Sequence, residues 1–280
     1  MVPAMTTNVA ASSGRKGACD MAVLDLFSLK GKVAVLTGGA GLYGRQCLSA
    51  LAEAGADTFI ASRNARNLEN VAVEYRDKGL KVTALSYDQG DEASILRLRD
   101  EVAKRCGRCD ILVNNAVSRT MRDWNDAAAT FDADLRINGT GLFVITRAFG
   151  ELMIPQRTGS IINIASMMGM VGLEQHNYDG TSMESWCGSY FFHKGGMINF
   201  TRFCASYFGR FNIRVNCISP GGLETPDQPE RFKANYAQRT QLGRLANDTD
   251  LMGLIVYLAS DASRYMTGAN IPLDGGYTAK

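Results

Sequence analysis

Tyr190 and Lys194 are the pair of side chains in this sequence best suited to moving a proton. They are four positions apart, a spacing that places two side chains on one face of a helix. A phenol has an ordinary pKa of about 10, and a neighbouring ammonium favours the phenolate and so lowers that pKa. Tyr190 is therefore a candidate proton donor and acceptor. Taken alone, the pair could also be an ordinary surface contact.

A glycine-rich turn upstream of this pair is a second candidate functional motif. Gly39-x-Gly41-x-x-Gly44 follows an apolar run at 33–37 and precedes a helical pattern, which is the context of a dinucleotide-binding turn. Glycines there let the backbone approach a pyrophosphate, and the N–H groups of a helix N-terminus attract it. The alternative is a purely structural turn. Ser166, directly after the run Ser160–Ala165, is expected on the same sheet edge.

The second strand ends in Ser62-Arg63, which bears on the choice of cofactor. An NAD enzyme usually has an acidic residue there to bind the ribose 2′-hydroxyl. A carboxylate would repel a 2′-phosphate, whereas the guanidinium of Arg63 can pair with one. NADP(H) is therefore favoured and NAD(H) remains possible, since Arg63 could instead lie over the adenine or cap the next helix.

The chain that positions these residues alternates short β-rich runs with longer helical patterns. This alternation predicts parallel strands joined by crossover helices. Strands are predicted near 33–37, 57–62, 81–87, 110–114, 160–165, 212–218 and 270–273, and helices near 42–54, 65–78, 91–105, 128–153, 190–208 and 248–259. The fold class is α/β, a doubly wound parallel sheet with helices on both faces. We expect a tail over residues 1–28 and one domain over 29–280. The segments 167–189 and 220–246 are candidate loops over a substrate.

The motifs from Thr37 to Gly276 resemble those of the short-chain dehydrogenase/reductase family. They are most similar to its short single-domain branch, which includes sugar and polyol dehydrogenases and oxoacyl reductases. The resemblance implies a Rossmann-like fold, a homotetramer or homodimer, and NAD(P)-dependent chemistry on CH–OH groups. It implies catalytic roles for Ser166, Tyr190, Lys194 and Asn138. It implies cofactor contacts at Gly38, Gly39, Gly41, Leu42, Tyr43, Gly44, Ser62, Arg63, Asp88, Asn115, Ala116, Tyr190, Lys194, Pro220, Gly221 and Thr225.

The sequence departs from the family pattern at several positions. Leu42 and Val117 stand where glycines are usual, so the pyrophosphate geometry and the floor of the groove should shift slightly. Ser166 and Tyr190 are farther apart than is usual, which makes Met167–Ser189 an insertion beside the substrate. Asn138 is followed by Gly139 and Gly141, which would kink a helix and free backbone groups for a water linked to Lys194. Alternatively, those glycines only allow close helix packing.

Substrate contacts are assigned to Glu174, His176 and Gly222. The polar run Glu174–Asp179 could hydrogen-bond a polyhydroxylated substrate, which favours a sugar, polyol or sugar acid, or it could be a solvated loop. The alternatives are a reductase of a 3-oxoacyl thioester or other apolar ketone, an epimerase that uses its cofactor transiently, and a cofactor-binding scaffold or redox sensor without turnover.

Composition argues against several other classes of protein. The net charge is +2 with both signs interleaved, so neither nucleic acid nor membrane is expected as a partner. Seven scattered cysteines and two histidines predict free thiols, no metal site and a cytoplasmic location. Cys106-Gly-Arg-Cys109 has the spacing of a redox or zinc half-site, but the absence of a second pair favours an ordinary helix end.

Overall fold

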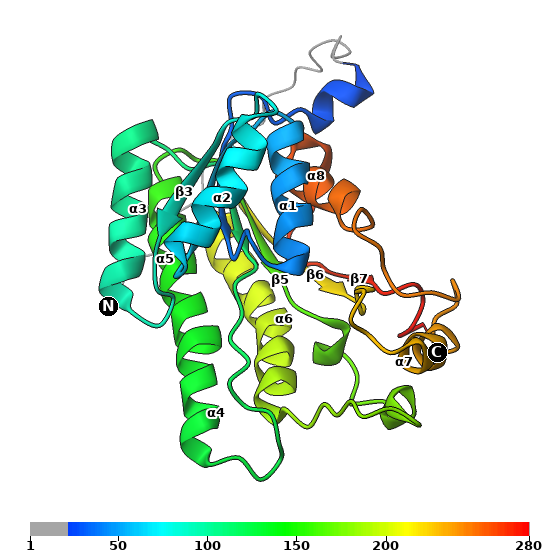
Figure 1. Cartoon of the computed structure of the whole chain (residues 1–280). Helices are drawn as coiled ribbons and strands as arrows, with labels where there is room; N and C mark the ends of the chain where they lie inside the picture. The colour runs from blue at the N-terminus through cyan, green and yellow to red at the C-terminus, as the bar shows by residue number, and fades with distance from the viewer. Residues whose placement is uncertain (1–21, 280) are drawn as a thin grey trace, which may run out of the picture.

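A seven-stranded sheet with every neighbouring pair parallel forms the centre of the molecule (Figure 1), in the order β3-β2-β1-β4-β5-β6-β7. This computed structural model describes residues 22–279. The strands are β1 (Val33–Thr37), β2 (Asp57–Ser62), β3 (Val82–Ser86), β4 (Ile111–Asn114), β5 (Gly159–Ile164), β6 (Ile213–Pro220) and β7 (Asn270–Leu273). The predicted doubly wound fold is confirmed.

Helices cover both faces of the sheet (Figure 1). One face packs against α1 (Leu42–Glu53), α2 (Ala65–Arg76) and α8 (Met252–Ala259). The other packs against α3 (Glu92–Cys106), α5 (Leu142–Met153) and α6 (Gly188–Gly209). Because both faces are covered, the strands are continuous apolar runs, and all five residues of β1 are buried.

The strand order reverses between β1 and β4, which pair in register with Leu36 opposite Val113. Chain connections leave these two strands toward opposite sides of the sheet, so a crevice opens beyond their carboxyl ends. The residues that follow are Gly38 after β1 and Asn115 after β4. The predicted glycine turn therefore lies at the position where such folds bind ligands.

The helix predicted over 128–153 is divided into three parts. It consists of α4 (Ala128–Leu135), a π-helical segment (Arg136–Gly141) and α5. Gly141 approaches the carbonyl of Gln89 so closely that a Cβ there would lie 2.2 Å from the Gln89 oxygen. Gln89 in turn donates its amide to the Ile137 carbonyl at 2.9 Å. The local irregularity expected from the glycines is present, together with a close packing contact.

Other boundaries also differ from the sequence prediction. The segment 220–246 contains α7 (Glu230–Ala237), and 167–189 contains the short 3-10 helices Met167–Gly169 and Gln175–Tyr178. The last long helix begins at Met252 rather than near 248, because the Asn247 side chain accepts the N–H groups of Thr249 and Asp250 in a turn. The remaining helices and strands agree with the prediction to within about two residues.

The tail expected over residues 1–28 falls partly outside the described residues, which begin at 22. Within the part that is described, Val23–Phe27 form a 3-10 helix, and the Phe27 ring lies 6.4 Å from that of Tyr257, measured between centroids. The end of this segment is thus packed against α8.

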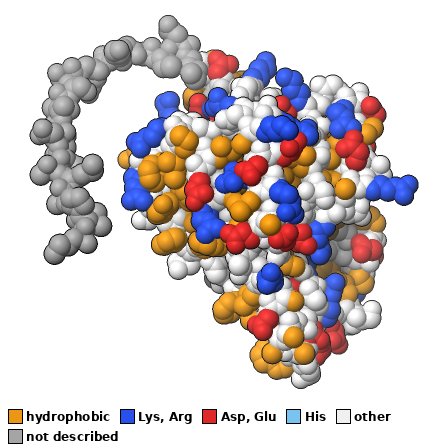
Figure 2. Space-filling model, turned by 90° about the vertical axis from the view of Figure 1, so that its left-hand side faces the viewer, with side chains coloured by type: hydrophobic (Ala, Val, Ile, Leu, Met, Phe, Trp, Pro, Cys, Tyr) orange, Lys and Arg blue, Asp and Glu red, His pale blue; other side chains and the backbone are white. Residues whose placement is uncertain are grey.

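Surface charges of both signs are interspersed on the face shown in Figure 2. Over residues 22–279, no helix has both the length and the apolar character that crossing a membrane requires.

Candidate active site

The glycine turn forms one wall of the site. Gly38 has a φ of +69°, a left-handed conformation that favours glycine. A Cβ on Gly44 would lie 2.0 Å from the Gly38 carbonyl oxygen. The close approach of α1 to the turn therefore depends on glycine at both positions, and α1 begins there with Gly41 as its N-cap.

The side chain of Asn115, which follows the neighbouring strand β4, is hydrogen-bonded to this turn. Its amide donates to the carbonyls of Thr37 at 3.1 Å and Gly38 at 3.0 Å. The Thr37 hydroxyl accepts the backbone N–H groups of Asn115 and Ala116, each at 3.0 Å. The ends of β1 and β4 are thereby fixed to each other before any ligand is bound.

A cavity of about 630 Å³ extends from this turn to Tyr190. Its far wall is joined to α1, since the Tyr43 hydroxyl donates to the Gly221 carbonyl at 2.9 Å. The predicted site residues that line the cavity are Gly38, Gly41, Leu42, Tyr43, Gly44, Ser62, Asn115, Ala116, Ser166, Tyr190, Pro220, Gly221, Gly222 and Thr225.

Seven predicted residues lie outside the cavity lining: Gly39, Arg63, Asp88, Asn138, Glu174, His176 and Lys194. Gly39 faces β2, where a Cβ would lie 2.7 Å from the Ile60 side chain. Asp88 uses one carboxylate oxygen to accept the Gly90 N–H at 2.8 Å. Arg63 is exposed beyond the end of β2, and the following helix is capped by the Asn64 side chain instead.

Tyr190 and Lys194 lie in the first turns of α6 on one side of the helix. The Lys194 ammonium is 5.7 Å from the centre of the Tyr190 ring and donates to the Ile164 carbonyl, at the end of β5, at 2.6 Å. Lys194 is only 3 % exposed and is not among the residues that line the cavity, so its charge acts on the phenol from within the protein. Ser166 follows β5 and accepts the Met168 N–H on its hydroxyl at 3.1 Å.

The electrostatics around the phenol favour its ionised form. Burial alone would raise the pKa of Tyr190, but the cations of Lys194 and Arg119 and a hydrogen bond from Ser166 outweigh it and lower the pKa. Burial also disfavours the charged form of Lys194, which for an ammonium lowers the pKa, and the nearby Tyr190 opposes that shift.

Arg119 is a site residue that the sequence reasoning missed. It lies in the loop after β4, lines the cavity, and places its guanidinium carbon 4.1 Å from the centre of the Tyr190 ring. A lone arginine after the Asn114-Asn115-Ala116-Val117 segment carries no spacing signal that points to Tyr190. Only the folded loop brings the two together.

Asn138 occupies the π-helical segment but faces the loop after β4. Its side chain accepts the Ser118 N–H and donates to the Ser118 carbonyl, both at 2.8 Å. Its amide nitrogen is 3.3 Å from Nδ1 of His193, the residue preceding Lys194. Asn138 therefore secures the loop that carries Arg119, while the water expected between Asn138 and Lys194 stays a prediction.

A buried carboxylate anchors the start of α6. Asp134 accepts the N–H groups of Thr120 at 2.8 Å and Met121 at 3.1 Å, and the Ser189 hydroxyl at 2.7 Å. Burial opposes ionisation, but these donors lower the pKa of Asp134 to about 2. In the same region, burial and the Lys194 charge lower the pKa of His193 to about 4, so that His193 is neutral near pH 7.

Two polar side chains of the segment Met167–Ser189, Glu174 and Asn177, contact other side chains of the protein. Glu174 accepts a hydrogen bond from His176 Nδ1 at 2.6 Å and lies 3.7 Å from Arg239. Asn177 is buried and donates to the Tyr277 hydroxyl at 2.8 Å. The part of the segment that lines the cavity consists instead of Met167, Met168, Tyr178, Met183, Ser185 and Cys187. Glu174 and His176 are not among the residues that line this cavity, and their contact with a substrate stays a prediction.

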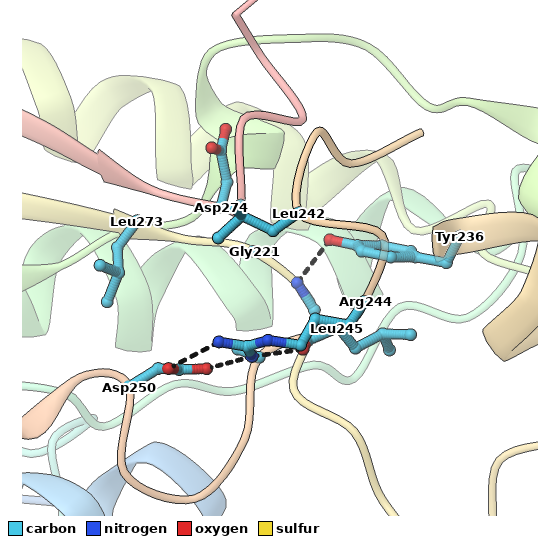
Figure 3. A pocket seen from close by; sticks show the side chains of 11 residues that line it. Gly221, Tyr236, Leu242, Arg244, Leu245, Asp250, Leu273 and Asp274 are labelled. Carbon is cyan, nitrogen blue, oxygen red and sulfur yellow. Dashed lines mark hydrogen bonds and ion pairs between the residues drawn. The ribbon is translucent and has the colours of Figure 1, made fainter. Parts of the chain in front are cut away.

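A second, smaller cavity of about 100 Å³ shares the lining residues Gly221, Gly222 and Tyr236 with the first. Figure 3 shows this smaller cavity, where the hydroxyl of Tyr236 in α7 accepts the Gly222 N–H at 2.6 Å. Arg244 and Asp250 form a two-bonded ion pair at the other end, with N–O distances of 2.6 Å and 3.0 Å. The Tyr236 hydrogen bond fixes Gly222 in the wall that the two cavities share.

The main cavity fits a dinucleotide. It provides a glycine turn packed so closely that side chains at Gly38 and Gly44 would meet protein atoms, a helix N-terminus for a pyrophosphate, and a buried lysine next to a phenol at the far end. No group of three potential metal-ligating His, Cys, Asp or Glu side chains is found within residues 22–279.

A parallel sheet with this turn and a Tyr–Lys pair at one cavity defines a nucleotide-dependent oxidoreductase. Residues 41–278 match the family described as "Enoyl-(Acyl carrier protein) reductase". A Thermotoga maritima 3-oxoacyl-[acyl-carrier-protein] reductase is 32% identical over 253 residues, covering 89% of this chain and 98% of that protein. The NADP-dependent mannitol dehydrogenase of Alternaria alternata is 34% identical over 271 residues, covering 91% and 96%.

A solved structure gives the same assignment. A gluconate 5-dehydrogenase from Burkholderia cenocepacia, in complex with NADP and tartrate, superposes with a TM-score of 0.82 at 30% identity, covering 92% of this chain and all of that one (100%). The chain belongs to the short-chain dehydrogenase/reductase family, as its motifs predicted. It is an NAD(P)-dependent enzyme that acts on CH–OH groups.

Proposed function

We propose that this enzyme interconverts a secondary alcohol and a ketone on a sugar, polyol or sugar acid, with NADP(H) preferred to NAD(H). The observation that carries the proposal is the Tyr190 phenol, at a cavity continuous with the glycine turn and with Lys194 buried beneath it. The mannitol and gluconate dehydrogenases among its relatives support the substrate class.

Each side chain has a distinct task in this proposal. Tyr190, with its lowered pKa, takes the proton from the substrate hydroxyl in oxidation and returns it in reduction. Lys194 holds positive charge beneath the ring, and its bond to the Ile164 carbonyl fixes its position. Ser166 donates a hydrogen bond to the substrate oxygen. The nicotinamide, when bound, supplies the hydride acceptor or donor.

The cofactor would be held by the turn Gly38–Gly44 and by the loop Pro220–Gly222. The preference for NADP(H) rests on Ser62 and Arg63 at the end of β2. Within residues 22–279, Arg63 is in none of the ion pairs, and Asn64 already caps α2. Its guanidinium is thus available to a 2′-phosphate, with no carboxylate at position 62 to oppose one.

A second candidate function is reduction of a 3-oxoacyl thioester or another apolar ketone. The observation in its favour is the apolar wall of the cavity near Tyr190, which consists of Met167, Met168, Met183, Phe191 and Phe232. The Thermotoga reductase supports the same alternative. A cofactor-binding scaffold without turnover is disfavoured, because Ser166, Tyr190 and Lys194 are all present and assembled.

We also propose assembly into a homotetramer or homodimer through the face of α5 and α6. Four aromatic side chains on these helices are exposed: Phe143, Phe192, Phe203 and Tyr207. Solvent-exposed aromatics gathered on neighbouring helices are typical of a protein–protein interface. Light scattering would give the mass in solution, and a monomer at micromolar concentration would contradict the proposal.

The free thiols among the described residues support a reducing, cytoplasmic location.

The test of the proposed function is an absorbance assay at the nicotinamide band. Polyols, aldonic acids, apolar alcohols and their ketones are offered with each cofactor. Tyr190→Phe should lose at least about a hundredfold in turnover while cofactor affinity stays within a few-fold, because only the proton carrier is removed. Turnover of long apolar substrates alone would refute the sugar, polyol or sugar acid assignment, and full activity of Tyr190→Phe would remove Tyr190 from its role.

A further inference from the structure

Arg119 places a cation at the reacting end of the cavity without an acidic partner. Its guanidinium carbon lies 4.1 Å from the centre of the Tyr190 ring and it lines the cavity. Among residues 22–279, no carboxylate lies within ion-pairing distance of it. The guanidinium therefore keeps its capacity for a two-bonded contact with an anion.

The backbone on both sides of Arg119 is fixed. The N–H and carbonyl of Ser118 are both bound by the Asn138 side chain at 2.8 Å. The N–H groups of Thr120 and Met121 are bound by Asp134 at 2.8 Å and 3.1 Å. Only the Arg119 side chain in this stretch lines the cavity. A guanidinium presented from a fixed backbone loses less conformational entropy when it binds a ligand.

The charge next to the Tyr190 ring is positive. The Arg119 guanidinium carbon and the Lys194 ammonium lie 4.1 Å and 5.7 Å from its centre. The one carboxylate in the cavity lining, Asp227, is exposed in the loop before α7 and forms no ion pair with Arg119, and the oxygens of Asp134 are taken by three donors. Two cations next to one phenol favour an anionic ligand at this end of the cavity.

We propose that Arg119 binds a carboxylate of the substrate, next to the carbon that bears the reacting hydroxyl. The natural substrate class is then a hydroxy acid and its keto acid rather than a neutral polyol. Because Arg119 is close to Tyr190, a carboxylate bound to its guanidinium would lie beside a substrate oxygen that is hydrogen-bonded to the phenol. This inference rests on the proposed function and narrows its substrate class.

The test compares ligands that share a carbon skeleton and differ in charge. Tartrate is paired with threitol, and gluconate with glucitol. Binding to the NADPH-loaded protein is measured by calorimetry, because reduced cofactor cannot accept a hydride from these alcohols and no turnover occurs. The variant is Arg119→Met, and the matched control is Arg122→Met, an exposed arginine of the same loop outside the cavity lining.

The wild type should bind the acid more tightly than the polyol in at least one pair. Arg119→Met should weaken binding of that acid at least about tenfold, because a charge-assisted contact is lost, and should leave the polyol within about twofold. Arg122→Met should change neither. If Arg119 acted only by tuning Tyr190, both members of a pair would lose turnover equally and binding of neither would change.

Four outcomes would overturn the inference: no preference for the acid in either pair, unchanged binding of the acid in Arg119→Met, equal losses for acid and polyol in Arg119→Met, or the same loss in Arg122→Met. Failure of the proposed function looks different, because wild-type enzyme would then give no change in nicotinamide absorbance with any alcohol or ketone, whatever the calorimetry gives.

Discussion

Asp134 accepts a hydrogen bond at 2.7 Å from the hydroxyl of Ser189, the residue directly before Tyr190 in α6. The same carboxylate binds the N–H groups of Thr120 and Met121, which follow Arg119. One buried side chain of α4 thereby ties the helix that carries the phenol to the loop that carries the neighbouring guanidinium. Asp134 is a positioning residue, because in this structure it acts on the phenol only through Ser189 and the loop.

Asp134→Asn is expected to destabilise the protein by about 2 kcal/mol, since both carboxylate oxygens accept from buried donors and the amide nitrogen that replaces one of them cannot accept. Urea unfolding measures this change. Asp132→Asn, an exposed acid of the same helix, is the control and should be neutral. An Asp134→Asn protein as stable as wild type would contradict the anchoring role.

The stability that Asp134 supplies should depend on pH in a defined window. Its folded pKa of about 2 lies below the ordinary value near 3.9. The ionised form is thus favoured by folding, so the contribution is complete above about pH 4 and is lost as the pH falls toward 2. The difference in unfolding free energy between wild type and Asp134→Asn should shrink over that range. A difference that grows on acidification has the wrong sign for this interaction.

Alcohol oxidation should rise with pH through the pKa of Tyr190, since the phenolate is the form that accepts a proton. Lys194 lowers that pKa, so Lys194→Met should move the ascending limb of kcat/KM to higher pH by about one unit or more, a shift worth about 1.4 kcal/mol per unit. The control is His193→Asn. His193 has a pKa of about 4 and is neutral over the assay range, so the limb should stay in place. A limb that disappears in His193→Asn would assign it to the imidazole instead.

Arg63→Ala should weaken NADP(H) binding at least about tenfold and leave NAD(H) within about twofold, because only NADP(H) carries the 2′-phosphate. Fluorescence titration of the reduced cofactors gives both affinities. Arg66→Ala, an exposed arginine in the first turn of α2, is the matched control. Equal losses for both cofactors in Arg63→Ala would mean that Arg63 contacts a part they share.

The fold was predictable because its signals are local. Buried parallel strands appear as apolar runs such as Ile111–Val113, and the Tyr190–Lys194 spacing fixes a helix face whatever surrounds it. The short helix α7 was missed, although Phe232 and Tyr236, both buried, have the four-residue spacing that marks one. Pro220, Pro226 and Pro229 made the segment look like an irregular loop.

The site was less predictable wherever side chains had a choice of partners. A polar run such as Glu174–Asp179 can bind a ligand or satisfy itself, and here Glu174 and Asn177 bond to His176 and Tyr277. Arg119 reaches Tyr190 only because Asp134 and Asn138 fix its loop, and those contacts join residues that are distant in sequence. Spacing rules describe one element at a time and miss contacts of this kind.

Gly44→Ala should damage the cofactor site through the backbone alone. The added Cβ would lie 2.0 Å from the Gly38 carbonyl oxygen and 3.1 Å from the Asn115 amide nitrogen, so α1 must move away from the turn. We expect cofactor affinity to fall at least about tenfold and the unfolding free energy to fall by about 2 kcal/mol, the usual effect of forced overpacking. Gly253→Ala, in α8 with nothing within 4 Å of the new Cβ, is the control and should be neutral or slightly stabilising. Since no charge, hydrogen-bonding group or catalytic side chain changes in Gly44→Ala, unaltered cofactor affinity would show that α1 does not have to approach the turn this closely for the dinucleotide to bind.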